Sequence, residues 1–382
     1  MQEKSKIWLS SPHMGGTEQN FVNQAFETNW VAPLGPNVNG FEEDLQKYIG
    51  EEKKVACLVS GTAALHLGLI QLGVGYGDEV LCQSFTFSAS ANPILYQGAT
   101  PVFIDSEAST WNICPIALEE AIKDRIQKGK KPKAIIAVHL YGMPYLVDEV
   151  HEIANTYKIP ILEDAAEALG STYKGRSCGT FGTFAALSFN GNKIITTSGG
   201  GALVCPNQEA KNKTVFLATQ ARDDAPHYQH SHIGYNYRMS NIVAGIGRGQ
   251  MQILNKHVDL RRKMHAFYTD AFQNITGVEV LSAPTEDFYA NHWLSSITVD
   301  PNQTKGLTRE DLRIAFLEEN IESRPLWKPM HLQPIFEKYP YYGKQVCEQL
   351  FKNGLCLPSG SNLTDNDRNR ILSVIYRFFK KQ

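Results

Sequence analysis

Residues 55–104 read VACLVSGTAALHLGLIQLGVGYGDEVLCQSFTFSASANPILYQGATPVFI, and this stretch decides the predicted fold. Three short apolar runs alternate in it with two stretches of helical pattern, at residues 55–59, 62–72, 79–82, 88–97 and 101–104. Strand–helix–strand units of this kind build a mainly parallel sheet that helices cover on both faces. The sequence therefore predicts an α/β fold.

The same alternation continues along the chain. Further strands are predicted at residues 133–138, 160–162, 184–189 and 202–204, and further helices at residues 17–28, 41–48, 115–127, 145–157 and 207–220. One long helical pattern then runs from about residue 241 to residue 272. The remainder mixes a strand at residues 293–299 with helices at residues 308–319, 344–352 and 364–379, and a proline-containing loop at residues 324–334. We predict a large domain at residues 1–255 and a smaller α+β domain at residues 256–382.

Composition and charge exclude several classes of protein. The 382 residues carry a net charge of -2 and no long block of like charge, which argues against a nucleic-acid or membrane-surface partner. The seven cysteines are dispersed and never stand in a C-x-x-C spacing, as is typical of reduced thiols. The first residues contain no apolar signal core, and no later run approaches a membrane span. We expect a cytoplasmic protein.

Residues 188–201, SFNGNKIITTSGGG, place one lysine in a small polar loop between two apolar runs. A strand–loop–strand unit presents Lys193 from a tight support, and the three glycines allow a sharp turn or a close approach. An amine that attacks a carbonyl must be positioned and desolvated, so one interpretation is a lysine held for Schiff-base chemistry. The other is an ordinary exposed lysine in a hairpin.

Two glycine-containing motifs follow or precede predicted strands. The sequence SGTAA at residues 60–64 follows a strand and opens a helix, so the amides of Gly61, Thr62 and Ala63 could bind a phosphate, or simply form a turn. The sequence GVGYGDEV at residues 73–80 resembles a dinucleotide fingerprint, but it precedes a strand. We interpret the second motif as a turn.

Three further features are ambiguous by themselves. Asp164 ends a predicted strand, where it could pair with a protonated heterocyclic nitrogen or cap a helix. Phe87 could stack on a planar ring or belong to the core. The three histidines of HYQHSH, at residues 227–232, lack acidic or cysteine partners at a fitting spacing, so we predict no metal site. Together with Lys193, however, these features supply the parts of a pyridoxal phosphate site in the expected chain order.

Over essentially its full length the chain resembles the fold-type I, pyridoxal-phosphate-dependent nucleotide-sugar aminotransferases of the DegT/StrS type. The motifs that carry this resemblance are SGTAAL, SFTF, EDAAEALG, SFNGNKIITTSGGG, GYNYRMSN and RPLWKPMH. The resemblance implies that Lys193 forms the Schiff base with the cofactor and then moves a proton, and that Asp164 keeps the pyridine nitrogen protonated.

The same resemblance implies the remaining site residues. The cofactor would be bound by Gly61, Thr62, Ala63, Phe87, Glu167 and Ser188, and by Asn236 acting on the neighbouring subunit's cofactor, so a homodimer with shared active sites is implied. The sugar nucleotide would be bound by Tyr228, His230, Arg238, Arg324, Trp327 and His331. The amino donor implied is glutamate.

The sequence departs from the commoner family pattern at Glu167, where many members have glutamine. A carboxylate near the cofactor's phenolic oxygen would repel it, so we predict that Glu167 is protonated or is turned aside by a hydrogen bond. The branch that makes the precursor of bacillosamine looks similar here and in RPLWKPMH and LCLPSG, which favours C4 of a UDP-linked 4-keto-6-deoxy-N-acetylhexosamine. The alternatives are a GDP- or dTDP-linked keto sugar, and a non-catalytic regulator that keeps the fold. A dehydratase of this fold would carry histidine in place of Lys193.

Overall fold

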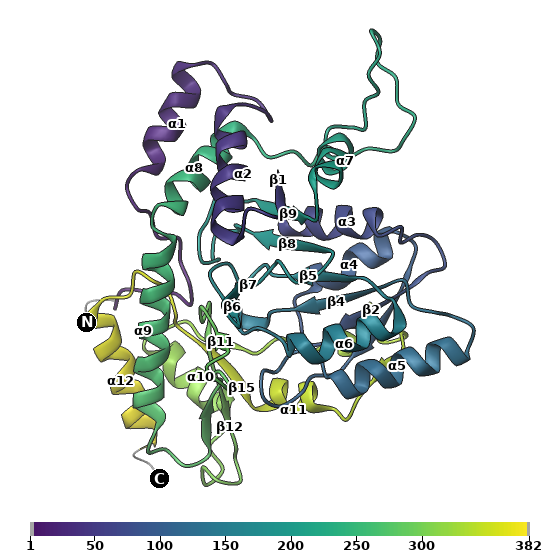
Figure 1. The fold of residues 1–382 in the computed structure, drawn as a ribbon. Coiled ribbons are helices and arrows are strands. Elements are labelled where there is room, and N and C mark those ends of the chain that lie inside the picture. Colours follow the sequence, from purple (N-terminus) through teal and green to yellow (C-terminus); the bar gives the residue numbers. More distant parts are fainter. Residues whose placement is uncertain (1–3, 380–382) are drawn as a thin grey trace.

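The computed structural model describes residues 4–379 and is built around an eight-stranded sheet with the order β1-β9-β8-β5-β4-β2-β3-β14 (Figure 1). Its strands are β1 (Lys54–Leu58), β2 (Glu79–Gln83), β3 (Thr100–Ile104), β4 (Ala134–Val138), β5 (Ile161–Asp164), β8 (Phe184–Ser188), β9 (Gly201–Cys205) and β14 (Tyr341–Tyr342). Strand β9 pairs antiparallel with both β1 and β8, and the pairs from β8 to β14 are all parallel. The predicted, mainly parallel sheet is confirmed.

Helices cover both faces of this sheet, as the continuous apolar strands require. The helices of the large-sheet region are α1 (Glu18–Glu27), α2 (Pro36–Ile49), α3 (Gly61–Gln71), α4 (Ser88–Tyr96), α5 (Pro115–Gln127), α6 (Val147–Tyr157), α7 (Gln208–Ala218) and α8 (Asn241–Met251), with a short 3-10 turn η1 (Leu140–Gly142). Along β2 the side chains alternate: Val80 and Cys82 pack with the apolar residues of α3 and α4, and Leu81 packs with those of α5 and α6. In Figure 1, α3 and α4 lie on one side of the sheet and α5 and α6 on the other.

A smaller sheet, with the order β10-β12-β15-β13, forms the second part of the fold. Its strands are β10 (Val278–Val280), β12 (Ser295–Val299), β13 (Arg324–Pro325) and β15 (Gly354–Leu357), and the C-terminal helices are α9 (Leu254–Phe272), α10 (Arg309–Glu318), α11 (Val346–Asn353) and α12 (Asp365–Phe379), with the 3-10 turn η2 (Met330–Leu332). A three-stranded sheet contains β6 (Thr172–Tyr173), β7 (Arg176–Ser177) and β11 (Phe288–Tyr289). The two-domain division at residues 255 and 256 falls within α9 and stays a prediction.

The single helix predicted from residue 241 to residue 272 is wrong, because the chain forms α8 and α9 with a break at Gln252 and Ile253. The glycines of α8 allow α1 and α2 to approach it closely: a Cβ atom at Gly249 would lie 2.7 Å from the backbone of Glu18, and one at Gly247 would lie 2.6 Å from the ring of Phe41. Helix α9 packs instead against the smaller sheet. The first turns of α9, with Leu254 and Val258, share the large-sheet core with Ala244 of α8, and the later part of α9, from Met264 on, joins the core of the smaller sheet.

Two other departures concern element ends and chain crossing. Helix α2 begins at Pro36, five residues before the predicted start, because proline suits the first helical turn. The C-terminal part of the chain also returns to the large sheet, where β14 pairs with β3.

No helix within residues 4–379 has the length and apolar character needed to cross a membrane.

Candidate active site

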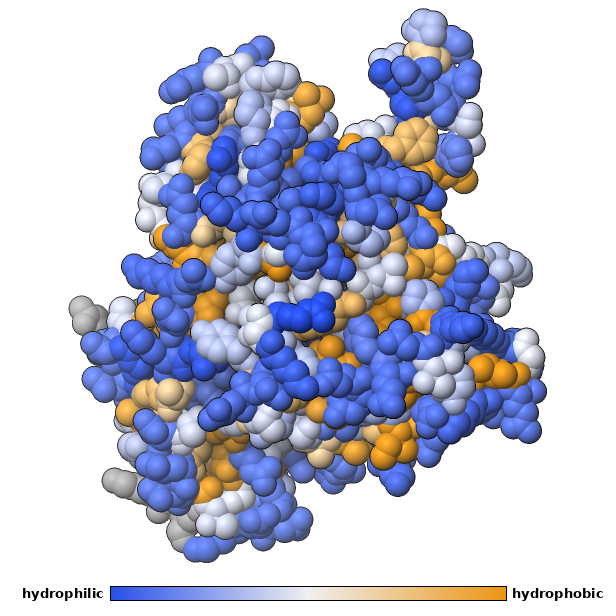
Figure 2. Space-filling model, viewed as in Figure 1, coloured by the Kyte–Doolittle hydropathy of each residue, from blue (hydrophilic) through white to orange (hydrophobic). Residues whose placement is uncertain are grey.

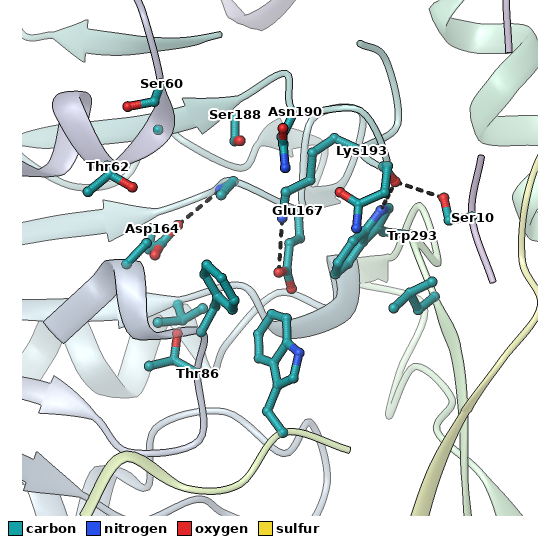
Figure 3. A pocket seen from close by; sticks show the side chains of 18 of the residues that line it. Ser10, Ser60, Thr62, Thr86, Asp164, Glu167, Ser188, Asn190, Lys193 and Trp293 are labelled. Carbon is teal, nitrogen blue, oxygen red and sulfur yellow. Dashed lines mark hydrogen bonds and ion pairs between the residues drawn. The ribbon is translucent and has the colours of Figure 1, made fainter. Parts of the chain in front are cut away.

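A cavity of about 670 Å³ lies at the carboxyl ends of β1, β2, β5 and β8, the edge at which parallel sheets bind ligands. Residues from the N-terminal segment and from the smaller sheet complete its lining. Of the sequence-predicted site residues, nine line this cavity: Gly61, Thr62, Phe87, Asp164, Glu167, Ser188, Lys193, Arg324 and Trp327. Figure 3 shows the side chain of Lys193 extending into the cavity towards Glu167.

Lys193 is held by a loop that residues far away in the sequence support. The backbone oxygen of Asn192 accepts hydrogen bonds from the hydroxyl of Ser10, at 2.7 Å, and from the indole nitrogen of Trp293, at 2.6 Å. The Lys193 side chain is only 13% exposed, and its Nζ atom lies 4.1 Å from the centre of the Trp293 ring. The loop therefore presents one largely desolvated amine, as the functional interpretation requires.

The carboxyl group of Glu167 lies beside that amine. Its Oε1 atom is 3.2 Å from Lys193 Nζ, and its Oε2 atom accepts a hydrogen bond of 2.7 Å from the backbone N–H of Tyr141. Burial raises the pKa of Glu167 to about 7, and the nearby Lys193 ammonium opposes that rise. The sequence-based prediction for Glu167 is either a retained proton or a hydrogen bond that turns it aside; the bond from Tyr141 and the raised pKa bear on both alternatives, and the choice between them stays a prediction.

Asp164 is buried at the end of β5 with its carboxylate fixed by two donors. Oδ2 accepts a hydrogen bond of 2.6 Å from the hydroxyl of Ser90, and Oδ1 accepts one of 3.2 Å from the backbone N–H of Ala166. The hydroxyl of Thr86 lies 2.7 Å from that of Ser90 and extends the network. Oxygen atoms oriented in this way can accept a hydrogen bond from a protonated ring nitrogen.

An anion site lies at the N-terminus of α3. Ser60 caps the helix, its hydroxyl accepting a hydrogen bond of 3.0 Å from the backbone N–H of Ala63, and the N–H groups of Gly61 and Thr62 precede the first intrahelical donors. A Cβ atom at Gly201 would lie only 2.3 Å from the backbone of Ser60 and Gly61. Strand β9 can therefore pack against this turn only because residue 201 is glycine. In Figure 3, Ser60, Thr62 and Ser188 gather at one side of the cavity, beside Asp164. The residues present fit a phosphate group there.

Aromatic rings form another wall of the cavity. The rings of Phe87 and Trp327 are 5.6 Å apart between centroids, and the ring of Tyr141 lies 5.1 Å from that of Trp327. Phe87 is 57% exposed, so its position at a strand end does not place it in the core. An exposed ring at the cavity suits a planar ligand.

Six predicted site residues do not line this cavity. Ala63 is buried in α3, and Arg238 forms an ion pair with Glu42 behind β1. His331 is stacked on Tyr341, with its Nδ1 atom 2.7 Å from the hydroxyl of Ser84. The other three, Tyr228, His230 and Asn236, lie between α7 and α8.

Residues 222–233 within that segment form an arm that projects from the body of the molecule (Figure 1), and its surface is mostly hydrophilic (Figure 2). Tyr228 on the arm is 80% exposed, and Nδ1 of His230 lies 2.9 Å from the backbone oxygen of Gln220. The arm therefore keeps Tyr228 and His230 away from the cavity of their own chain.

The sequence reasoning missed several residues of the cavity. Asn190 and Asn192 stand inside the lysine motif, where their spacing from Lys193 could have marked them, but Ser10 and Trp293 carry no such signal. Ser10 lies 182 residues before its hydrogen-bond partner. Contacts over that distance follow from the tertiary fold and not from a local pattern.

A family model, the DegT/DnrJ/EryC1/StrS aminotransferase family, matches residues 12–376. The chain belongs to this family. Members of the DegT/DnrJ/EryC1/StrS family are pyridoxal-phosphate-dependent sugar aminotransferases, so the protein is a transaminase that uses pyridoxal phosphate and acts on a sugar. The predicted fold-type I architecture and cofactor are confirmed.

Curated relatives and solved structures agree with this family. EpsN of Bacillus subtilis (strain 168), provisionally named as a pyridoxal phosphate-dependent aminotransferase, is 50% identical over 98% of this chain and 96% of its own length. A GDP-perosamine synthase of Caulobacter vibrioides is 34% identical over 98% of this chain and 99% of its own. The crystal structure of a DegT/DnrJ/EryC1/StrS aminotransferase from Brucella abortus superposes with a TM-score of 0.88 at 29% identity, over 95% of each chain. The finer assignment to the bacillosamine branch is not among these findings.

Proposed function

We propose that this enzyme transfers an amino group from glutamate to C4 of a nucleotide-linked 4-keto-6-deoxy sugar, through a covalent bond between Lys193 and the cofactor. The observation that carries the proposal is the position of Lys193, whose largely buried amine lies in the same cavity as Asp164 and the N-terminus of α3. A lysine, a ring-nitrogen partner and a phosphate site are the groups that pyridoxal phosphate requires of a protein.

Different residues of the cavity would bind different parts of the cofactor. Gly61, Thr62 and Ser188 would bind the phosphate, Asp164 the ring nitrogen and Phe87 one ring face. When bound, pyridoxal phosphate supplies an aldehyde carbon to the lysine amine and a ring that accepts an electron pair. The hydroxyl of Ser90 keeps the Asp164 carboxylate oriented towards the cavity.

The protein itself positions and moves the protons. Lys193 would act first as a nucleophile and, once released, as the base and acid that moves one proton within the site. Its reach is fixed by Trp293 and Ser10, which anchor the backbone of Asn192.

We further propose a UDP-linked N-acetylated sugar as substrate. This proposal is supported by Glu167 and by the RPLWKPMH and LCLPSG segments, which look similar to the branch that makes the precursor of bacillosamine. A GDP-linked sugar is the second candidate, favoured by the 34% identity to a GDP-perosamine synthase. Arg324 and Trp327 line the cavity and would contact either sugar nucleotide.

We also propose that two copies of the chain share their active sites. The arm carries Tyr228 and His230 away from the cavity of their own chain, where a second subunit could receive them. Phe26, Trp30 and Leu34 near the N-terminus are each at least 40% exposed, which is typical of a surface that another chain covers. In such a dimer, Asn236 would reach the neighbouring cofactor phosphate.

An absorption measurement and an amino-transfer assay test the proposal. The purified protein should show an imine absorption band that is lost in Lys193→Ala and in Lys193→Arg, the second variant keeping the charge. Amino transfer from glutamate should be fastest with a UDP-linked 4-keto-6-deoxy-N-acetylhexosamine among UDP-, GDP- and dTDP-linked keto sugars. A faster reaction with the GDP sugar would overturn the choice of nucleotide, and a band that survives in both variants would overturn the role of Lys193.

A further inference from the structure

Glu167 carries a buried carboxyl group beside the reacting amine. Burial disfavours its charged form, so a Glu167 carboxylate needs a positive charge close by. Its side chain is buried, with Lys193 Nζ at 3.2 Å from one oxygen and the backbone N–H of Tyr141 at 2.7 Å from the other. The ammonium of Lys193 therefore supplies the opposite charge that stabilises a Glu167 carboxylate.

Among the described residues that shift the pKa of Glu167, only Lys193 supplies positive charge; the Arg324 guanidinium lines the same cavity but is not one of them. Asp164 is a second carboxyl group in the same cavity, and it raises the pKa of Glu167. Burial raises the pKa of the Tyr141 hydroxyl well above its ordinary value and that of the Cys356 thiol to about 12, so both groups are neutral at physiological pH. The charge of Glu167 thus depends on the charge of Lys193.

We propose that Glu167 is a catalytic proton acceptor and donor for Lys193: as a carboxylate, it takes the proton that Lys193 releases on condensing with a carbonyl group. This inference rests on the proposed role of Lys193 and adds a second acid–base group to the site.

The atoms and charges of this step balance. The carbon–nitrogen double bond forms as the carbonyl oxygen leaves with two of the three ammonium protons as water. The third proton passes from Nζ to the Glu167 oxygen that lies 3.2 Å away. The cavity keeps the same net charge, and a buried carboxylate is not left without its partner. When a substrate amine later displaces Lys193, the released amine is neutral and acts as the base. Glu167 returns its proton to that amine only after the proton transfer is complete.

A count of protons on cofactor loading tests the proposal. Pyridoxal phosphate is titrated calorimetrically into cofactor-free protein, in two buffers of different ionisation enthalpy, for the unaltered chain and for Glu167→Gln. From a pKa of about 7, Glu167 of the cofactor-free protein is about nine-tenths ionised at pH 8 and about one-tenth at pH 6. We expect Glu167→Gln to release about one proton more than the unaltered chain at pH 8, and about one-tenth of a proton more at pH 6.

An infrared difference spectrum gives a second measure that does not depend on the pKa of the Lys193 amine. Loading at pH 8 should produce a protonated-carboxyl band in the unaltered chain and in Glu322→Gln, a matched control at another carboxylate of the cavity, but not in Glu167→Gln. Equal proton counts at pH 8 together with no carboxyl band would overturn the proposal. If no variant of Lys193 alters the absorption band of the loaded protein, the proposed function itself fails, which is a separate outcome.

Discussion

The charge of Glu167 predicts how the stability of the cofactor-free protein depends on pH. Burial raises the pKa of this carboxyl group from 4.5 to about 7 in the folded state. Between these two pH values the folded state holds the proton and the unfolded state has released it, so the free energy of unfolding falls as pH rises. From pH 5 to pH 8 this loss amounts to about 2 to 3 kcal/mol.

The variant Glu167→Gln removes this titration and keeps the shape of the side chain. Its free energy of unfolding, relative to that of the unaltered chain, should therefore rise by about 2 to 3 kcal/mol between pH 5 and pH 8. Urea unfolding of the cofactor-free proteins at the two pH values measures this difference. A rise below about 1 kcal/mol, or a fall, would refute the reasoning.

Asp105 offers a control, because its carboxyl pKa is lowered in the folded state whereas that of Glu167 is raised. Hydrogen bonds from the backbone N–H groups of Cys347, Val346 and Ser106 lower the pKa of its buried carboxyl group. Both its folded and its unfolded pKa therefore lie below pH 5. Asp105→Asn should lose stability by the same amount at pH 5 and at pH 8, which shows that the pH dependence at Glu167 belongs to that site.

Three further variants test the support of the site. Ser90→Ala removes one of the two donors to Asp164, and we expect amino transfer to slow by about tenfold with unchanged folding, measured as kcat. Trp293→Phe keeps a ring beside Lys193 but loses the hydrogen bond to the backbone oxygen of Asn192, so kcat should fall by about fivefold, and an unchanged kcat would contradict the role of that bond. Gly201→Ala places a Cβ atom 2.3 Å from the Ser60 turn, and equilibrium dialysis should show at least about tenfold weaker cofactor binding.

The large sheet could be predicted from sequence because its strands are short, apolar and separated by helices of ordinary length. The ends of the strands predicted within residues 55–162 agree with those of β1 to β5 to within two residues. The return of the chain as β14 could not be predicted, because Tyr341 and Tyr342 are paired by a strand more than 200 residues earlier. The break before α9 was also missed, because helical periodicity does not reveal which core a helix face joins.

Some residues of the site could likewise be predicted from the sequence, and others could not. Asp164 ends β5, and Gly61 and Lys193 lie in the segments that follow β1 and β8, so the rule that parallel strands end at a common edge brings them together. Trp293 reaches the cavity from the segment before β12 and Ser10 from the N-terminal segment, and no local spacing in the sequence indicates either residue. The homodimer and the residues of the arm stay predictions.

The anchoring of the Asn192 backbone by Ser10 and Trp293 has a consequence for biosynthesis. The cavity is lined by Leu9 and Ser10 near one end of the chain and by Cys356 near the other. A chain still emerging from the ribosome can fold the first strands of the large sheet, but it lacks the indole that fixes the lysine loop until residue 293 has been made. We therefore expect cofactor capture to follow the synthesis of the smaller sheet, so nascent chains that lack it should remain free of the cofactor.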